Sequence, residues 1–292
     1  MKQFWIAAAS ALLVSVASAQ QPPRVEPEVA KLPLAIDGKT VEVVTHIYKP
    51  PGEGPFPLVI YSHGRAGDRI DRVKMQYPMA VGHGNYWLRK GVAVVAPVRP
   101  GYGETGGADD EDSGSKWRGS DCYTNPDFKR VALNARKTVV ATYQWALQQP
   151  WVRKDRILIE GQSVGGMTTV AVSVLNLPGV VGTVNFAGGA GGARDISPGK
   201  SCQPQNLTEL YREFGREARA PSLWLYAAND LYWGAEMPPK WHAAYKEGNS
   251  DTELVHTGPV EGADGHQLLL KGGRMWSVPL DAFVKKVGLT AK

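Results

Sequence analysis

Ser163 lies in a sequence pattern that suits a nucleophile. It stands in the run Gly161-Gln162-Ser163-Val164-Gly165, which joins an apolar stretch typical of a buried strand to one typical of a helix. A sharp strand-to-helix turn exposes the serine Oγ, and the flanking glycines let the strand and the helix approach closely. The start of the helix adds backbone N–H groups that can stabilise a developing oxyanion. We therefore predict Ser163 as a nucleophile and the N–H of Val164 as one oxyanion donor.

A serine hydroxyl needs a general base to become an effective nucleophile. Where a serine lies on such a turn, an acidic residue and then a histidine follow it along the chain. Three histidines follow Ser163. His242 falls within a predicted helix and His256 within a predicted strand. His266 lies instead in a glycine-containing loop just past the last predicted strand, and we predict it as the general base.

The acid that orients His266 should follow the preceding strand. The predicted strand 222–227 leads into Asp230, which lies where the chain leaves the sheet. Asp264, only two residues before His266, is the alternative, and we expect it to shape the loop of the histidine. On chain order and strand placement, the predicted acid is Asp230.

A second oxyanion donor is expected after another predicted strand. The segment Ser62-His63-Gly64-Arg65 follows that strand, and its turn would direct the N–H of Arg65, or that of Gly64, toward the point that Val164 also faces. His63 precedes the serine in the chain, so we predict that it braces this turn and is not the base.

Three aromatic residues are candidates for substrate binding. Tyr232 and Trp233 directly follow the predicted acid, and Tyr102 lies in a glycine-rich loop after a predicted strand. We predict that all three line the substrate site.

The motifs, in this order, resemble the dienelactone-hydrolase-like branch of the α/β-hydrolase superfamily. The likeness extends over about residues 40–288, and its motifs lie at 62–64, 99–103, 161–166, 228–230 and 265–266. The resemblance implies an α/β-hydrolase fold and hydrolysis of a carboxylic ester through an acyl-enzyme, with no cofactor. Dienelactone hydrolase itself has a Cys nucleophile where this chain has Ser163, so the resemblance does not carry dienelactone over as the substrate.

Two other functions stay open. An exported peptidase or amidase of the same fold would need a further domain, or carboxylates that hold a peptide terminus, and the acidic run Asp109–Asp112 could bind an amine. A non-catalytic binding protein on this scaffold would usually have lost one residue of the triad, and none is missing here.

The predicted elements alternate between strands and helices. Polar alternation predicts a strand at 40–48, and apolar runs predict strands at 57–62, 91–97, 156–160, 180–187, 222–227 and 253–257. Apolar residues at helical spacing predict helices at 127–149, 164–175, 237–247 and 281–287. This alternation predicts one α/β domain over residues 36–292, with a mostly parallel, doubly wound sheet flanked by helices, after a flexible lead-in at 20–35.

Charge and motif spacing argue against several classes of partner. The net charge of +5 comes from scattered Lys and Arg pairs, whereas nucleic-acid binding concentrates basic charge on one face. The sequence Gly101–Gly106 fits G-x-G-x-x-G, but an acidic run and not an apolar helix follows it, so no dinucleotide is expected. No cluster has metal-ligand spacing. We expect a small-molecule or oligomeric ester as substrate, no nucleic acid and no metal.

The N-terminus predicts export. A basic start, an apolar stretch over 4–16 and the sequence Ala17-Ser18-Ala19 are typical of a signal peptide that is cleaved before Gln20. The apolar stretch is too short for stable membrane anchoring, so we predict a periplasmic or secreted protein. In an oxidising compartment, the only two cysteines, Cys122 and Cys202, are expected to form a disulfide, although two separate thiols are the alternative.

Overall fold

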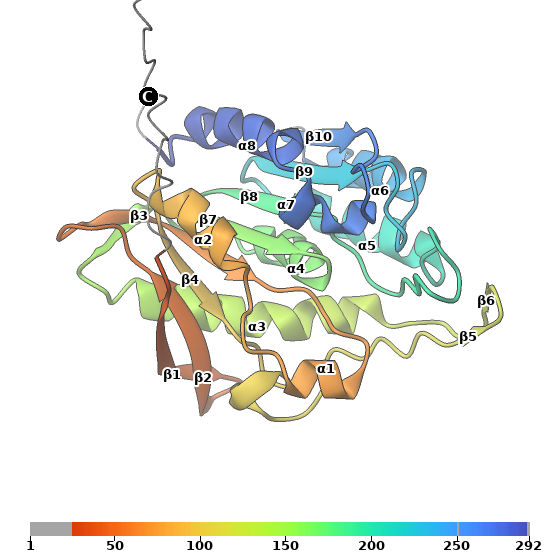
Figure 1. The fold of residues 1–292 in the computed structure, drawn as a ribbon, viewed down its shortest axis with the longest axis horizontal. Helices are drawn as coiled ribbons and strands as arrows, with labels where there is room; N and C mark the ends of the chain where they lie inside the picture. The colour runs from red at the N-terminus through yellow and green to blue at the C-terminus, as the bar shows by residue number, and fades with distance from the viewer. Residues whose placement is uncertain (1–24, 250, 291–292) are drawn as a thin grey trace, which may run out of the picture.

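An eight-stranded sheet forms the centre of the computed structural model, which describes residues 25–249 and 251–290 (Figure 1). The spatial order is β1-β2-β4-β3-β7-β8-β9-β10. The pairs β1–β2 and β2–β4 are antiparallel, and every other neighbouring pair is parallel. The strands are β1 (Glu28–Ile36), β2 (Lys39–Tyr48), β3 (Phe56–Ser62), β4 (Ala93–Pro97), β7 (Val152–Gln162), β8 (Val180–Phe186), β9 (Ser222–Ala227) and β10 (Thr252–Thr257). A separate small hairpin consists of β5 (Trp117–Arg118) and β6 (Asp121–Cys122).

Helices cover both faces of this sheet. On one face pack α2 (Val81–Leu88), α7 (Leu268–Lys271) and α8 (Arg274–Lys286). On the other face pack α3 (Phe128–Ala146), α4 (Val164–Ser173), α5 (Pro204–Glu217) and α6 (Met237–Lys246). The remaining helical turns are α1 (Arg69–Val73), η1 (Gly103–Thr105) and η2 (Gly265–Gln267). The predicted α/β-hydrolase architecture, a mostly parallel sheet between helical layers, is confirmed.

Strand β9 illustrates why the sequences of the central strands are continuously apolar. Leu223 and Leu225 belong to the core on the α8 side, whereas Trp224 and Tyr226 belong to the core on the α5 and α6 side. Side chains alternate across a strand, so a strand covered on both faces has no polar alternation.

The flexible lead-in predicted for residues 20–35 is wrong for residues 28–35. They form most of β1, which pairs with β2 along its length. Leu32 and Leu34 are buried there opposite Val43 and Val41, so their burial holds the segment on the sheet. The predicted signal peptide, its cleavage site and residues 20–24 lie outside the described residues.

Two helices of eight or more residues were not predicted, and one begins earlier than predicted. The helices α2 and α5 are additional, and α8 starts at Arg274 rather than at 281 because Trp276 and Leu280 continue its buried face. No helix within residues 25–249 and 251–290 is long and apolar enough to cross a membrane.

The predicted disulfide between Cys122 and Cys202 is confirmed. It joins β6, in the long loop before α3, to the segment just before α5, across a separation of 80 residues. The bridge therefore ties together two loops that leave the sheet after β4 and after β8.

Candidate active site

The turn between β7 and α4 holds Ser163 in a strained conformation. Its φ is +57° and its ψ is −124°, a region that a residue with a side chain rarely adopts. Two sets of hydrogen bonds stabilise it. The N–H of Ser163 donates to the carbonyl oxygen of Phe186 over 2.9 Å, and its own carbonyl oxygen accepts from the N–H groups of Met167 and Gly189. Strain that the surroundings enforce in this way is typical of functional sites.

Close packing explains the glycines around the serine. A Cβ atom on Gly161 would overlap the carbonyl oxygen of Gly165, and one on Gly165 would overlap that of Ser62. Strand β7, helix α4 and the loop after β3 therefore meet at distances that only glycine permits. The N–H of Val164 is among the first of α4, which have no acceptor within the helix.

Asp230 and His266 lie in hydrogen-bond contact at the same edge of the sheet. The Nδ1 of His266 is 2.9 Å from Oδ2 of Asp230, whose side chain is completely buried. The other carboxylate oxygen accepts from the N–H groups of Tyr232 and Trp233 over 2.7 and 3.1 Å. A carboxylate only accepts, so Nδ1 of the ring carries the hydrogen, and in the neutral form of such a ring Nε2 is the acceptor.

Asp264 shapes the loop of the histidine, as the sequence predicts. Its Oδ1 accepts from the N–H of His266 over 2.8 Å and from the N–H of Leu231 over 2.9 Å. Gln162, which precedes the serine, donates from Nε2 to the carbonyl oxygen of His266 over 3.0 Å. Sequence reasoning missed Gln162, although its place in the turn beside Ser163 was known.

Two predicted aromatic residues pack against the imidazole of His266. The ring centroid of Tyr232 lies 4.3 Å from that of His266, and Tyr232 is half-buried. The Trp233 ring lies edge-on at 5.5 Å, is only 2% exposed, and donates from Nε1 to the carbonyl oxygen of Ala187. Burial does not support the prediction that Trp233 lines the substrate site, because its indole is enclosed and packs against the imidazole.

Burial likewise does not support the prediction that Tyr102 lines the substrate site. Its side chain has no exposed surface, and its hydroxyl donates to Oε2 of Glu111 over 2.8 Å. Burial, followed by the Glu111 carboxylate, raises the pKa of the Tyr102 hydroxyl. Its partners are protein groups: the Arg99 guanidinium lies over its ring and His63 packs edge-on against it.

His63 braces the turn after β3, as predicted. Its Nε2 accepts from the N–H of Arg99 over 3.0 Å, so Nδ1 carries the hydrogen and donates to the carbonyl oxygen of Gly64 over 2.6 Å. Burial, aided by the Arg99 charge, holds the pKa of His63 well below its usual value, so the ring stays neutral. This turn packs on the serine, because a Cβ on Gly64 would lie 3.2 Å from that of Ser163.

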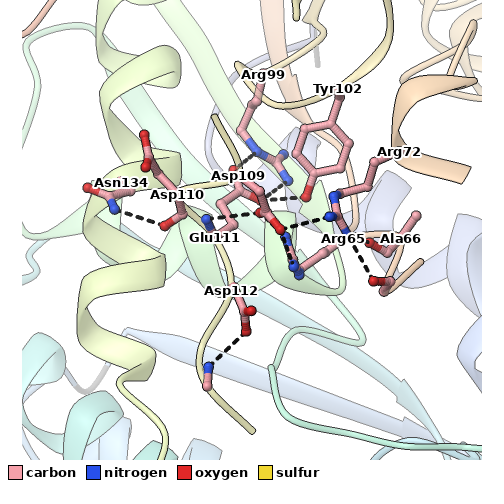
Figure 2. A network of polar contacts seen from close by, with 12 residues as sticks. Arg65, Ala66, Arg72, Arg99, Tyr102, Asp109, Asp110, Glu111, Asp112 and Asn134 are labelled. Atoms are coloured by element: carbon pink, nitrogen blue, oxygen red, sulfur yellow. Dashed lines mark hydrogen bonds and ion pairs between the residues drawn. The ribbon is translucent and has the colours of Figure 1, made fainter. Parts of the chain in front are cut away.

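The acidic run after η1 is paired with arginines (Figure 2). Asp109 binds the guanidinium groups of Arg65 and Arg72, and the hydrogen bond from Arg65 lowers its pKa. Glu111 is buried and binds Arg99. The idea that this run holds an amine is therefore wrong for Asp109 and Glu111, since their charges are already compensated. Among residues 25–249 and 251–290, no group of three or more His, Cys, Asp or Glu side chains could hold a metal ion.

Comparisons with known proteins connect this chain to hydrolases at the level of fold. No family model matches the sequence, and no curated protein matches it. Among solved structures, the esterase Pf2001 of Pyrococcus furiosus superposes with a TM-score of 0.62 at 17% identity, over 91% of this chain and 98% of that one. Esterase 2 of Thermogutta terrifontis, phosphonylated by sarin, gives 0.57 at 16% identity, over 93% and 98%.

Two further neighbours have other described activities. A Klebsiella pneumoniae protein assigned as a dienelactone hydrolase gives a TM-score of 0.57 at 15% identity, over 89% of this chain and 97% of that one. A puromycin-hydrolysing peptidase of Mycobacterium tuberculosis also gives 0.57 at 15% identity, over 94% of this chain and 42% of that one. These similarities establish the α/β-hydrolase fold of the chain.

Proposed function

We propose that this protein is an exported serine hydrolase that cleaves carboxylic esters through an acyl-enzyme, with Ser163 as nucleophile, His266 as base and Asp230 as orienting acid. The observation that carries the proposal is the 2.9 Å contact between His266 and the buried Asp230, at the sheet edge where the strained Ser163 lies. An imidazole held by a carboxylate and a serine on a strand-to-helix turn are the groups that acyl transfer needs.

In the first half of the reaction, the Oγ of Ser163 attacks the acyl carbon of the ester while Nε2 of His266 takes the hydroxyl proton. The Asp230 carboxylate stabilises the imidazolium that forms. When the tetrahedral intermediate collapses, the bond between the acyl carbon and the alcohol oxygen breaks, and the imidazolium returns its proton to the leaving alcohol. The acyl group then remains on Ser163.

The second half repeats these steps with water. His266 removes a proton from the water as it attacks the acyl carbon, and the carboxylic acid leaves as Ser163 recovers its proton. In both halves the negative oxygen would be held by the N–H groups of Val164 and Arg65. Such donors stabilise the transition state more than the substrate and thus raise kcat.

Tyr232 is the predicted substrate-binding residue that the burial pattern still supports. Its ring is half-buried and lies against His266, so a group of the substrate beside the imidazole would contact it.

Hydrolysis of peptides or amides is the second candidate. The similarity in fold to a puromycin-hydrolysing peptidase favours keeping it. Against it, Asp109 and Glu111, the acidic side chains suggested as amine ligands, are occupied by arginines. The ester reading therefore stands first, and a non-catalytic role is disfavoured because each residue of the triad is present.

Export is supported by two independent features. The N-terminal sequence is typical of a cleaved signal peptide, and the Cys122–Cys202 disulfide suits an oxidising compartment. Intact-mass measurement of protein from the cell envelope or medium should show a chain that begins at Gln20. A full-length chain confined to the cytosol would contradict export.

A paired assay tests the catalytic proposal. Purified protein is offered p-nitrophenyl esters of increasing acyl length beside aminoacyl anilides, and turnover of the esters should dominate. A fluorophosphonate should add one adduct, on Ser163, and the Ser163→Ala protein should neither label nor turn over ester. Full esterase activity in the Ser163→Ala protein would end the proposal, and a preference for anilides would replace it with the second candidate.

A further inference from the structure

Arg99 is a buried cation with a single carboxylate partner. It follows β4, and its side chain is 1% exposed. Its Nε donates to Oε1 of Glu111 over 2.6 Å and its Nη2 donates to Oε2 over 3.0 Å, which is a bidentate pair. A buried ion pair of this kind often stabilises a fold no more than apolar residues would. Stability alone therefore does not account for placing an arginine here.

The other contacts of Arg99 converge on the turn that follows β3. Its Nη1 donates to the carbonyl oxygen of His63 over 2.6 Å and to the Ser62 hydroxyl over 3.1 Å. Its Nη2 reaches the carbonyl oxygen of Gly64 at 3.4 Å, and its backbone N–H donates to the imidazole of His63. One residue thus holds three consecutive residues of the turn.

These contacts determine which way the peptide groups of the turn face. In a trans peptide, the C=O of one residue and the N–H of the next point in opposite directions. The carbonyl oxygen of Gly64 is held by His63 and Arg99, so the N–H of Arg65 points away from them. Gly64, which precedes this N–H, packs directly on Ser163.

We propose that Arg99 is a positioning residue for the oxyanion hole: its guanidinium, held by Glu111, turns the carbonyl oxygens of His63 and Gly64 toward itself and thereby presents the N–H of Arg65 to the oxyanion formed at Ser163. The inference rests on the proposed function and adds to it a group that touches neither substrate nor triad. A lysine cannot replace this arginine, because its single ammonium lacks the planar fork that reaches the carboxylate and the two carbonyls together.

The experiment compares Arg99→Lys with Arg72→Lys as the matched control. Arg72 is also a largely buried arginine that binds a carboxylate and two backbone carbonyls, but these are Asp109, Ala66 and Gly67. For each protein, kcat and KM are measured on the best p-nitrophenyl ester. The inhibition constant of a trifluoromethyl ketone, whose adduct with serine places an oxyanion in the same hole, is measured alongside.

Arg99→Lys should lower kcat on the order of 10²-fold, the usual result of losing one oxyanion donor, with KM changed less than about threefold. The inhibition constant of the ketone should rise in parallel with the loss of kcat/KM. Arg72→Lys should change neither. Glu111→Gln, which keeps the shape but not the charge of the partner, should show the same pattern to a smaller degree, so a poorly folding Arg99→Lys protein does not leave the question undecided.

Two failures can be told apart. If Ser163→Ala retains activity, the proposed function fails. If Ser163→Ala is inactive while Arg99→Lys and Glu111→Gln keep kcat and the inhibition constant of the parent, only the role of Arg99 is overturned. An equal loss in Arg99→Lys and Arg72→Lys overturns it as well, since the effect would then be general to the loop.

Discussion

Gln162 joins the nucleophile turn to the loop of the base, because its Nε2 donates to the carbonyl oxygen of His266 over 3.0 Å. The two residues lie 104 positions apart in the sequence. Three hydrogen bonds thus place the histidine: from Gln162 to its carbonyl oxygen, from its N–H to Asp264 and from its ring to Asp230. The ring is therefore held from both its backbone and its side chain.

Gln162→Met removes the donor and keeps the length of the side chain. We expect kcat to fall about tenfold on the best ester, since the carbonyl of His266 loses its partner and the proposed base is held less firmly in position. Gln149→Met is the control, because Gln149 makes a comparable bond to the carbonyl oxygen of Trp145 at the end of α3. Steady-state kinetics of both variants decide the point, and equal activities of the two would show that the Gln162 contact does not position the base.

Asp230 and Asp264 make different hydrogen bonds, so their substitutions should have different effects on turnover. Asp230→Asn should reduce turnover on the order of 10⁴-fold, because an amide in this place favours the wrong tautomer of His266. Asp264→Asn should cost roughly tenfold or less, since an amide oxygen can still accept from the N–H groups of Leu231 and His266. Assays of kcat with both purified variants test the assignment. A larger loss of kcat in Asp264→Asn than in Asp230→Asn would show that Asp264, and not Asp230, is the orienting acid.

The order of elements could be predicted because each strand carries its own signal. The runs that become β3, β4, β7 and β8 are rich in apolar, β-branched residues, and the run that becomes β9 is apolar and aromatic, as is typical of parallel strands buried on both faces. Ser163, Asp230 and His266 were then assigned from their places at strand ends. The chain order predicts that the last two meet, and they do.

Long-range contacts explain what the sequence did not reveal. The glycine-rich loop around Tyr102 suggested that its side chain could contact a substrate. Its ring is instead buried against Glu111 and Arg99, which contact it only in the folded chain. Helix α5 did carry a usable signal: Pro204 at its start and buried apolar residues at helical spacing from Leu207 to Phe214. Arg99 and Gln162 had no such pattern, because a single polar side chain reaching a backbone carbonyl has no periodicity.

Replacing both bridged cysteines by serine should destabilise the protein. The Cys122–Cys202 bridge closes a loop of 80 residues, and loss of a native disulfide typically costs about 2–5 kcal/mol. Urea unfolding of the double variant and of the parent, with and without reductant, measures this difference. The parent should show no free thiol when unfolded without reductant, and two reactive thiols there would contradict the bridge.

Stability should fall on mild acidification, and His242 is one cause. Burial, followed by the nearby charge of Lys246, lowers the pKa of His242 to about 4 in the folded protein, whereas an unfolded histidine has its usual value of 6.5. Between these two pH values His242 is protonated in the unfolded chain but stays neutral in the folded protein. The contribution of neutral His242 to folding is therefore complete above pH 6.5 and is lost as the pH falls toward 4.

The test is the free energy of unfolding in urea at several pH values from 7 to 4.5. His242→Gln, which can still bond the hydroxyl of Thr252, should flatten the decline by about 1–2 kcal/mol after allowance for solvent around the ring. Lys246→Gln should flatten it less, since it removes only the smaller cause. Part of the decline in stability should remain in this variant, because the pKa of the buried His63 is also well below its usual value. An unchanged pH dependence in His242→Gln would show that this ring takes up its proton equally in both states.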